Sequence, residues 1–398
     1  MSLLPKRDSM KSLRILLVMI EPPLPFGNAA ARWFYVLLKG LVERGHSVTA
    51  FVSCSKSEDI EKAMILFPAD KYDLRCYPSR HANGLLAKLE TLRQPYSYLF
   101  SPELRRDLDS ELQRNFDVLH LEQLWSGWLG LGHKERAVVN VHYLFSLDRV
   151  FQSPDTLENR IRRFITYRAE EKLLRYFPMI MTLSDRMTDH IARLNPHARL
   201  YTIPLGIDLS LYPFDEQKQS SKQPVAGLIG SFNWAPSYSA AERLLTLLWP
   251  EIKSRVPDAR LLIAGRSAND MLSSFAGLPD VEIYHDVPDI LPYFNKIDVF
   301  IYAPWSGSGM KVKILEAFAL GVPVVTNRDG VEGIPAQDGI HADICEDDKD
   351  LIARAVDLLK SPAHRKIRRL KARQLVEKYC SPAVALEKVE QVYETISK

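Results

Sequence analysis

The chain has 398 residues, of which 46% are hydrophobic and 25% are charged. These proportions are typical of a folded globular protein, and the length favours two domains. The formal net charge of +3 is too small to predict nucleic acid as a partner, and no apolar run approaches the length that spans a bilayer.

The N-terminal apolar run and the cysteines bear on the cellular compartment. Residues 15–20 are apolar, but Glu21 and two prolines follow them in place of a small-residue cleavage site. This run therefore predicts a buried strand and not a signal peptide. The four cysteines lack the spacing of a zinc site, so reduced thiols, no zinc and a cytoplasmic location are expected.

Strands and helices are predicted to alternate through the first half of the chain, which is typical of parallel sheets covered by helices. Residues 13–20 are apolar throughout, as expected of a strand buried on both faces. Helices are predicted at 29–44, closed by Gly45, and at 157–176. Further strands are expected at 47–53, 117–122, 137–143, 179–184 and 200–206.

A polar segment divides the chain. Residues 215–223 contain no apolar side chain and are interpreted as part of an interdomain linker. The pattern then restarts with a strand at 224–231 and a helix at 238–255. Further strands are expected at 259–266, 281–285, 298–304 and 323–327, with a last helix at 383–397. The predicted division is a first domain over 1–210, a linker over 211–224 and a second domain over 225–380.

The stretch 306–326 combines features of a phosphate-binding site. A short Gly/Ser loop after an apolar strand leads into a helix that carries Lys311, Lys313 and Glu316. Backbone N–H groups at a helix N-terminus, together with two lysines, suit a phosphate-bearing ligand. Glu316 lies about one turn beyond Lys313 and can accept two hydroxyl hydrogen bonds, as from a ribose. Together these features indicate a nucleotide-sugar site.

The two lysines are not expected to act alike. On one continuous helix they would lie about 200° apart, so both reach a single phosphate only if the helix begins after Lys311. We expect Lys313 to serve the donor from the helix and Lys311 to reach from the loop. A solvated basic face is the alternative that this pattern alone leaves open.

The same stretch resembles the donor-site signature of retaining glycosyltransferases with the GT-B architecture, in the glycogen synthase and mannosyltransferase-like superfamily (group 1, family 4-like). The branch it resembles most has a loop reading small-Gly-x-basic-x-Lys-x-Leu-Glu-Ala-x-Ala. The likeness continues in order at residues 230–236, 249–250, 264–266 and 286–289. It implies two Rossmann-like domains that face a cleft, with ligands at the carboxyl ends of the strands. It also implies that the C-terminal helix, 381–398, crosses back to the first domain.

The resemblance assigns donor-binding roles in the second domain. Glu316 is expected to bind the ribose, the backbone of Val287 to read the nucleobase edge, and Arg266 to contact phosphate or base. Many superfamily members carry another glutamate eight residues before Glu316, where this chain has Ser308. That difference puts any transferred catalytic carboxylate in doubt, although Ser308 remains a donor-binding candidate. The other donor-binding candidates are Gly230, Ser231, Gly309, Ile314 and Leu315.

Candidates in the first domain follow its predicted strands. Gly27 is expected to approach the diphosphate from the opposite side of the cleft, and Arg32, one turn into the next helix, to bind a substrate phosphate or the acceptor. His142 matches the family position that faces the sugar and acceptor, and is a catalytic candidate. His120 and Glu122 are acceptor-binding candidates, with a satisfied core role as the alternative.

The predicted reaction moves a sugar from a nucleotide-diphosphate donor to a hydroxyl acceptor, in glycan, glycolipid or glycoconjugate biosynthesis. Lys311 and Lys313 are catalytic candidates because they would stabilise the leaving diphosphate, together with Arg266. The resemblance implies retention of configuration through front-face attack assisted by the leaving phosphate. It also implies independence of metal, with no cofactor beyond the nucleotide sugar.

The acceptor is left open among glycans, lipid-linked sugars and small molecules. The helix at 157–176 carries five arginines with Phe164 and Tyr167, and could rest on anionic lipid headgroups at the inner face of a membrane. An ordinary basic surface helix is the alternative to such peripheral membrane contact.

Two other functions remain open. A nucleotide-sugar epimerase on the same fold would need acidic groups beside the sugar, which the donor loop lacks. A noncatalytic sugar-nucleotide-binding protein would bind the donor without turnover. A nicotinamide dehydrogenase is disfavoured because the first strand is followed by EPPLPFG and not by G-x-G-x-x-G.

Overall fold

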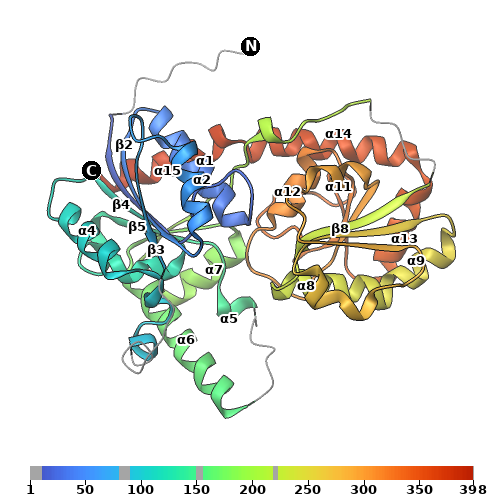
Figure 1. Ribbon diagram of the computed structural model, residues 1–398, viewed down its shortest axis with the longest axis horizontal. Coiled ribbons are helices and arrows are strands. Elements are labelled where there is room, and N and C mark those ends of the chain that lie inside the picture. The colour runs from blue at the N-terminus through green and yellow to red at the C-terminus, as the bar shows by residue number, and fades with distance from the viewer. Residues whose placement is uncertain (1–10, 80–89, 149–155, 218–222, 398) are drawn as a thin grey trace.

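The computed structural model describes residues 11–79, 90–148, 156–217 and 223–397, so part of the predicted linker, 218–222, lies outside the described residues. Within the described residues the chain forms two lobes side by side, each an open parallel sheet with helices on its faces (Figure 1). This confirms the expected α/β architecture of two Rossmann-like lobes.

The first sheet has seven parallel strands in the order β3-β2-β1-β4-β5-β6-β7. Its inner strands are almost wholly buried because helices cover both faces. The strands are β1 (Arg14–Met19), β2 (Ser47–Cys54), β3 (Asp73–Pro78), β4 (Val118–Glu122), β5 (Ala137–Val141), β6 (Met179–Thr182) and β7 (Arg199–Thr202).

The second sheet has six parallel strands in the order β10-β9-β8-β11-β12-β13. Both sheets therefore reverse their winding beside their first strand, at β1/β4 and at β8/β11, which is where ligands bind in open α/β sheets. The strands are β8 (Val225–Ser231), β9 (Arg260–Arg266), β10 (Val281–His285), β11 (Val299–Tyr302), β12 (Val324–Asn327) and β13 (Asp343–Cys345).

Among the described residues, helices lie between most successive strands, and the last three helices follow β13. Those of the first lobe are α1 (Ala29–Glu43), α2 (Ser57–Leu66), α4 (Pro102–Leu112), α5 (Phe145–Asp148), α6 (Leu157–Tyr176) and α7 (Asp185–Leu194). Those of the second are α8 (Ala235–Arg243), α9 (Trp249–Arg255), α10 (Ala268–Leu272), α11 (Leu291–Lys296), α12 (Val312–Ala319), α13 (Asp348–Lys360), α14 (Pro362–Tyr379) and α15 (Pro382–Ile396). Short 3₁₀ turns lie at Ser97–Leu99, Leu124–Gly130, Lys134–Arg136, Leu209–Leu211 and Ser273–Phe275. Among the described residues, no helix combines the length and apolar character needed to cross a bilayer.

Three elements differ from the predictions. The strands β3 and β13 were not predicted, because β3 is a partly exposed edge strand with polar residues and β13 spans only three residues. The single helix expected at 238–255 is instead α8 and α9 joined by a π-helical turn, Leu244–Leu248. The second helix begins beside Pro250, which has no backbone N–H to continue the first.

The helix α15 returns from the second lobe and packs against α1 of the first (Figure 1). Its Glu390 accepts a hydrogen bond of 2.8 Å from Arg44 and lies 3.2 Å from the ring of His46. Its Tyr393 is fully buried and hydrogen-bonds His120 on β4. The first lobe is therefore completed by residues that follow the second lobe in sequence.

Candidate active site

The loop after β11 is seated on the first lobe. The hydroxyl oxygen of Ser308 accepts a hydrogen bond of 3.0 Å from the backbone of Leu144, and the Ser308 backbone N–H donates to the Asp148 carboxylate. A Cβ added at Gly309 would lie 2.7 Å from the carbonyl oxygen of His142, so only glycine permits this close approach. The carboxyl ends of β5 and β11 therefore meet at this loop.

The two lysines reach the same region by different routes. The helix α12 begins at Val312, with Lys311 as its N-cap, which satisfies the geometric condition for both side chains to serve one ligand. Lys313 donates a hydrogen bond of 2.5 Å to Ser237 and lies 4.4 Å from the centre of the Tyr302 ring. Lys311 curls back to donate to the Gly309 carbonyl. The ammonium groups thus lie beside the N-terminus of α12.

Gly230, at the end of β8, makes room for one of these groups. A Cβ added there would lie 2.9 Å from the Lys313 ammonium nitrogen. Ser231 follows it, half-buried, at the same edge of the sheet. The residues predicted to line the donor site therefore lie next to one another at the end of β8 and the start of α12.

Burial makes both lysines easier to deprotonate. It lowers the pKa of Lys311 to about 8, although the Asp148 carboxylate opposes this shift. It lowers the pKa of Lys313 to about 7, and repulsion from Lys311 adds to that effect. Two crowded cations with little solvation are stabilised by an anion placed between them, as a diphosphate would be.

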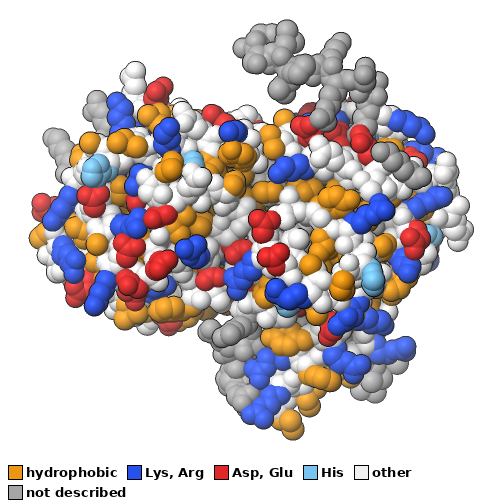
Figure 2. All heavy atoms as spheres, turned by 180° about the vertical axis from the view of Figure 1, so that it is seen from behind, with side chains coloured by type: hydrophobic (Ala, Val, Ile, Leu, Met, Phe, Trp, Pro, Cys, Tyr) orange, Lys and Arg blue, Asp and Glu red, His pale blue; other side chains and the backbone are white. Residues whose placement is uncertain are grey.

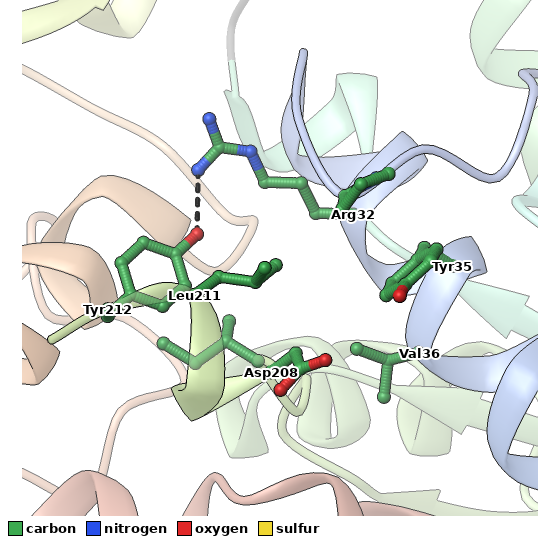
Figure 3. Close-up of a pocket in the computed structure, with 8 residues that line it drawn as sticks. Arg32, Tyr35, Val36, Asp208, Leu211 and Tyr212 are labelled. Atoms are coloured by element: carbon green, nitrogen blue, oxygen red, sulfur yellow. Dashed lines mark hydrogen bonds between the residues drawn. The ribbon is translucent and has the colours of Figure 1, made fainter. Parts of the chain in front are cut away.

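Glu316 forms a contact between the lobes. It is buried, accepts a hydrogen bond of 3.0 Å from the Tyr212 hydroxyl, and is ion-paired with Arg32 of α1. Arg32 also donates a hydrogen bond of 3.0 Å to Tyr212, as Figure 3 shows. Arg32 therefore lies at the predicted ribose carboxylate, and a ribose would have to share or displace these partners. The small pocket drawn in Figure 3 is lined by Pro25, Arg32, Tyr35, Val36, Ile207, Asp208, Leu211 and Tyr212.

Glu122 lies at the centre of a buried network in the first lobe. Its carboxylate accepts hydrogen bonds of 2.9 Å from Trp33, 3.2 Å from Asn140 and 2.6 Å from the Nε2 of His142. It also lies 3.0 Å from the Nε2 of His120. Burial alone would raise the pKa of Glu122, but the two histidine rings lower it below its ordinary value.

The residues of this network differ in their exposure to solvent. His120 and Glu122 have no exposed surface, so the structure gives neither of them a side-chain atom with which to contact an acceptor. His142 keeps a small exposed fraction and lies next to Gly309 of the donor loop. The core role that the sequence left open for His120 and Glu122 is the one that the structure supports, and both lie behind His142.

The remaining candidates lie around this centre. Gly27 occupies the loop between β1 and α1 with φ +101°, and Arg266 is exposed at the end of β9. Val287 is half-buried after β10, in a turn where the Asp286 carboxylate accepts a 3.0 Å hydrogen bond from the backbone of Ser267. The side chains of Ile314 and Leu315 are wholly buried in the core, so only their backbone could face a ligand.

Three residues at the site were not identified from the sequence. Glu21 follows β1, is hydrogen-bonded by Asn28, and has a pKa raised by burial. Asp148 accepts a hydrogen bond from the donor loop, and Tyr212 donates one to Glu316. A carboxylate directly after a buried strand was a usable signal for Glu21, whereas the other two depend on contacts between the lobes. Within the described ranges, no three His, Cys, Asp or Glu side chains gather as a metal site would require.

Two facing Rossmann-like lobes, with basic side chains at a helix N-terminus between them, define the GT-B class of glycosyltransferase. Family models support this assignment: the model described as Glycosyltransferase Family 4 matches residues 30–211, and that described as Glycosyl transferases group 1 matches residues 223–361. The chain belongs to this superfamily of GT-B glycosyltransferases. No curated protein matches it significantly in sequence.

Solved structures share the fold over nearly the whole chain. Sucrose-phosphate synthase from Thermosynechococcus elongatus is 14% identical, with a TM-score of 0.70 over 96% of this chain and 99% of its own. HepE from Anabaena, solved with UDP and glucose, is 12% identical, with a TM-score of 0.68 over 96% and 100%. WaaG, a glycosyltransferase of lipopolysaccharide biosynthesis, is 14% identical, with a TM-score of 0.66 over 96% and 99%. At these identities the likeness establishes the fold.

Proposed function

We propose that the protein transfers a hexosyl group from a nucleoside diphosphate sugar to a hydroxyl acceptor, with retention of configuration and without a divalent metal. The observation that carries this proposal is the pair of ammonium groups of Lys311, which is buried, and Lys313, which is half-buried, beside the N-terminus of α12 and about one turn from Glu316. A diphosphate would compensate both lysines, and a ribose would bind Glu316 by sharing or displacing Arg32 and Tyr212.

The main catalytic requirement of this reaction is to stabilise the charge on the leaving diphosphate. As the glycosidic bond breaks, negative charge develops on the phosphate oxygens. Fixed cations and backbone N–H groups in a site with little water stabilise that charge most strongly. Lys311, Lys313 and the exposed Arg266 would supply this in place of a metal ion. The acceptor hydroxyl would attack from the same face, assisted by the departing phosphate.

His142 is the proposed first-lobe contact to the sugar or acceptor. Glu122 binds its Nε2, so its Nδ1 is the ring atom left for substrate. Glu21 and Asp148 stand at the same edge of the sheet and provide acceptors for sugar hydroxyls. We propose that the acceptor enters on this side, as part of glycan, glycolipid or polysaccharide biosynthesis. We also propose a cytoplasmic location, on the ground that the four cysteines are scattered along the sequence without a recognisable spacing.

The test begins with donor binding. Nucleoside diphosphates and their sugars are screened by thermal shift, starting with UDP-glucose because HepE was solved with it. The best donor is then incubated with and without acceptor alcohols, in excess chelator, and the anomeric configuration of the product is read by NMR. Transfer with retention in chelator is expected, and a requirement for added magnesium or manganese would contradict the metal-free site.

The same incubation separates the alternatives. An epimerase would convert the donor into an epimeric nucleotide sugar without any acceptor. A noncatalytic binding protein would show a thermal shift with neither hydrolysis nor transfer. Either result would replace the proposed transfer reaction.

A further inference from the structure

The helix α6 exposes an apolar stripe that points away from the protein. Leu157, Ile161 and Phe164 are 74%, 50% and 61% exposed, and their i, i+4, i+7 spacing places them on one face of the helix. The buried residues of α6 lie on the opposite face, at Thr166, Ala169, Glu170, Leu173 and Leu174. The stripe therefore plays no part in the packing of the first lobe.

Basic side chains flank the stripe. Arg160 and Arg168 are exposed on this side of the helix, and the Arg168 guanidinium lies 5.6 Å from the centre of the Phe164 ring. Arg162 lies about 100° or more around the helix from each stripe residue and is ion-paired with Glu158 at 3.1 Å. Residues 157–168 contain four arginines and a single acidic residue, Glu158. In Figure 1 the N-terminal part of α6 projects from the body of the molecule, and Figure 2 shows basic and hydrophobic side chains together on the projecting part.

We propose that α6 docks the protein on an anionic lipid surface, with Leu157, Ile161 and Phe164 entering the boundary of the acyl chains and the arginines binding lipid phosphates. The charge of this face favours lipid over a protein partner, because an acidic bilayer surface supplies phosphate to Arg160 and Arg168 at once. The projection of the helix lets it meet a flat surface before the rest of the protein does.

The docked helix is connected to the site through α5. The Glu170 carboxylate on α6 accepts hydrogen bonds of 2.8 Å and 3.2 Å from the backbone of Phe145 and Ser146 on α5. On α5, Asp148 accepts from the backbone of Ser308 in the donor loop. A lipid surface held by α6 would therefore lie close to the acceptor side of the cleft. The docking itself does not depend on the proposed reaction, since it is measured without substrate.

Vesicle co-sedimentation tests the proposal with the full chain. The wild-type protein is expected to sediment with vesicles of phosphatidylglycerol and phosphatidylcholine, less with phosphatidylcholine alone, and less in high salt. The variant Leu157→Ser/Ile161→Ser/Phe164→Ser is expected to lose binding with an unchanged thermal melt, because the replaced side chains are exposed. The variant Arg160→Gln/Arg168→Gln is expected to bind roughly 25-fold more weakly, at about fivefold per charge.

A matched control uses apolar residues exposed on the second lobe. The variant Leu247→Ser/Ile340→Ser/Ile367→Ser removes the same kind of surface and is expected to bind vesicles like the wild type. Equal binding to neutral vesicles, or equal loss in the control variant, would overturn the proposal. So would a wild-type dimer in light scattering that the α6 variant disperses without any change in vesicle binding, since the stripe would then join two copies of the chain.

Discussion

The first-lobe and second-lobe sides of the candidate site differ in how far the charges of their side chains are compensated by neighbouring groups. In the first lobe, the Glu122 carboxylate is surrounded by donors from Trp33, Asn140 and His142, so its charge is compensated within the lobe. In the second lobe, Lys311 and Lys313 donate hydrogen bonds to neutral groups, Gly309 and Ser237, and burial lowers the pKa of both, although the Asp148 carboxylate opposes this for Lys311.

We infer from this difference that the Glu122 network positions side chains, whereas the two lysines bind the ligand. A compensated buried network fixes the orientation of its members and gains little from a ligand. A pair of cations whose hydrogen-bond partners are neutral gains more when an anion arrives. We therefore expect variants of the second lobe to impair use of the donor, and variants of the Glu122 network to impair stability.

The largest effect is expected from Lys313→Ala. Removing one fixed donor to developing charge typically costs a factor of about 100 to 1,000 in turnover. Steady-state and single-turnover rates with the best donor measure this loss. Lys349→Ala, at an exposed position of α13, is the matched control and should retain wild-type rates. Near-wild-type turnover in both Lys313→Ala and Lys311→Ala would remove the lysines from the site.

Glu316→Gln is expected to weaken donor binding by about two orders of magnitude. Two hydroxyl hydrogen bonds to a charged acceptor are together worth about 3 kcal/mol or more. Calorimetric titration with the donor measures the loss, and Tyr212→Phe is the milder companion because it removes one partner of Glu316 without changing the charge. If Glu316 served only to pair with Arg32, the variant would lower the melting temperature and leave donor affinity unchanged.

A change of pH is expected to have a smaller effect on the stability of the protein and on its affinity for the donor. The pKa values of about 8 for Lys311 and about 7 for Lys313 lie below the unfolded value of 10.5, so the unfolded chain holds more protons between pH 7 and 10. These groups therefore make the ligand-free protein more stable as pH rises through that window. A bound diphosphate raises both pKa values, so donor binding should take up protons near pH 8 and weaken above it.

Titrations in two buffers of different ionisation enthalpy measure this proton uptake. The observed heat should differ between the buffers, and the difference should shrink in Lys313→Ala. Identical heats at pH 8 would show that the lysines are already fully charged in the free protein.

The smallest effect on the donor is expected from Glu122→Gln. The change leaves donors of the network imperfectly paired, which should lower the free energy of unfolding by about 1–3 kcal/mol. Donor affinity should stay within about twofold, because the network belongs to the first-lobe side of the site. Glu135→Gln, exposed in the same lobe, is the control for chemical denaturation. A large loss of donor affinity with unchanged stability would reverse the roles assigned to the two sides.

Local patterns predicted most of what lies within one segment. Apolar runs predicted the inner strands, and the Gly/Ser loop before α12 made Lys311 and Lys313 candidates because the loop, the start of the helix and both lysines lie within a few consecutive residues. The edge strands β3 and β13 escaped prediction because they bury too little apolar surface to leave a pattern.

Contacts between distant segments could not be predicted from the sequence. Arg32 and Glu316 are ion-paired across the two lobes, and nothing near either residue predicts the other. Likewise, the sequence shows Glu122 and His142 as separate candidates but not that one binds the other. Such pairs arise from the relative placement of the lobes and of parallel strands, which only the folded chain defines.

The return of α15 to the first lobe has a consequence for synthesis on the ribosome. Tyr393 hydrogen-bonds His120 and α15 packs on α1, so the interior of the first lobe closes only after the whole second lobe has been made. The second lobe, by contrast, has all its strands once α13 and α14 have emerged. The first lobe therefore cannot complete its packing until the C-terminal helix has left the ribosome, and until then the α1 surface that α15 covers stays exposed.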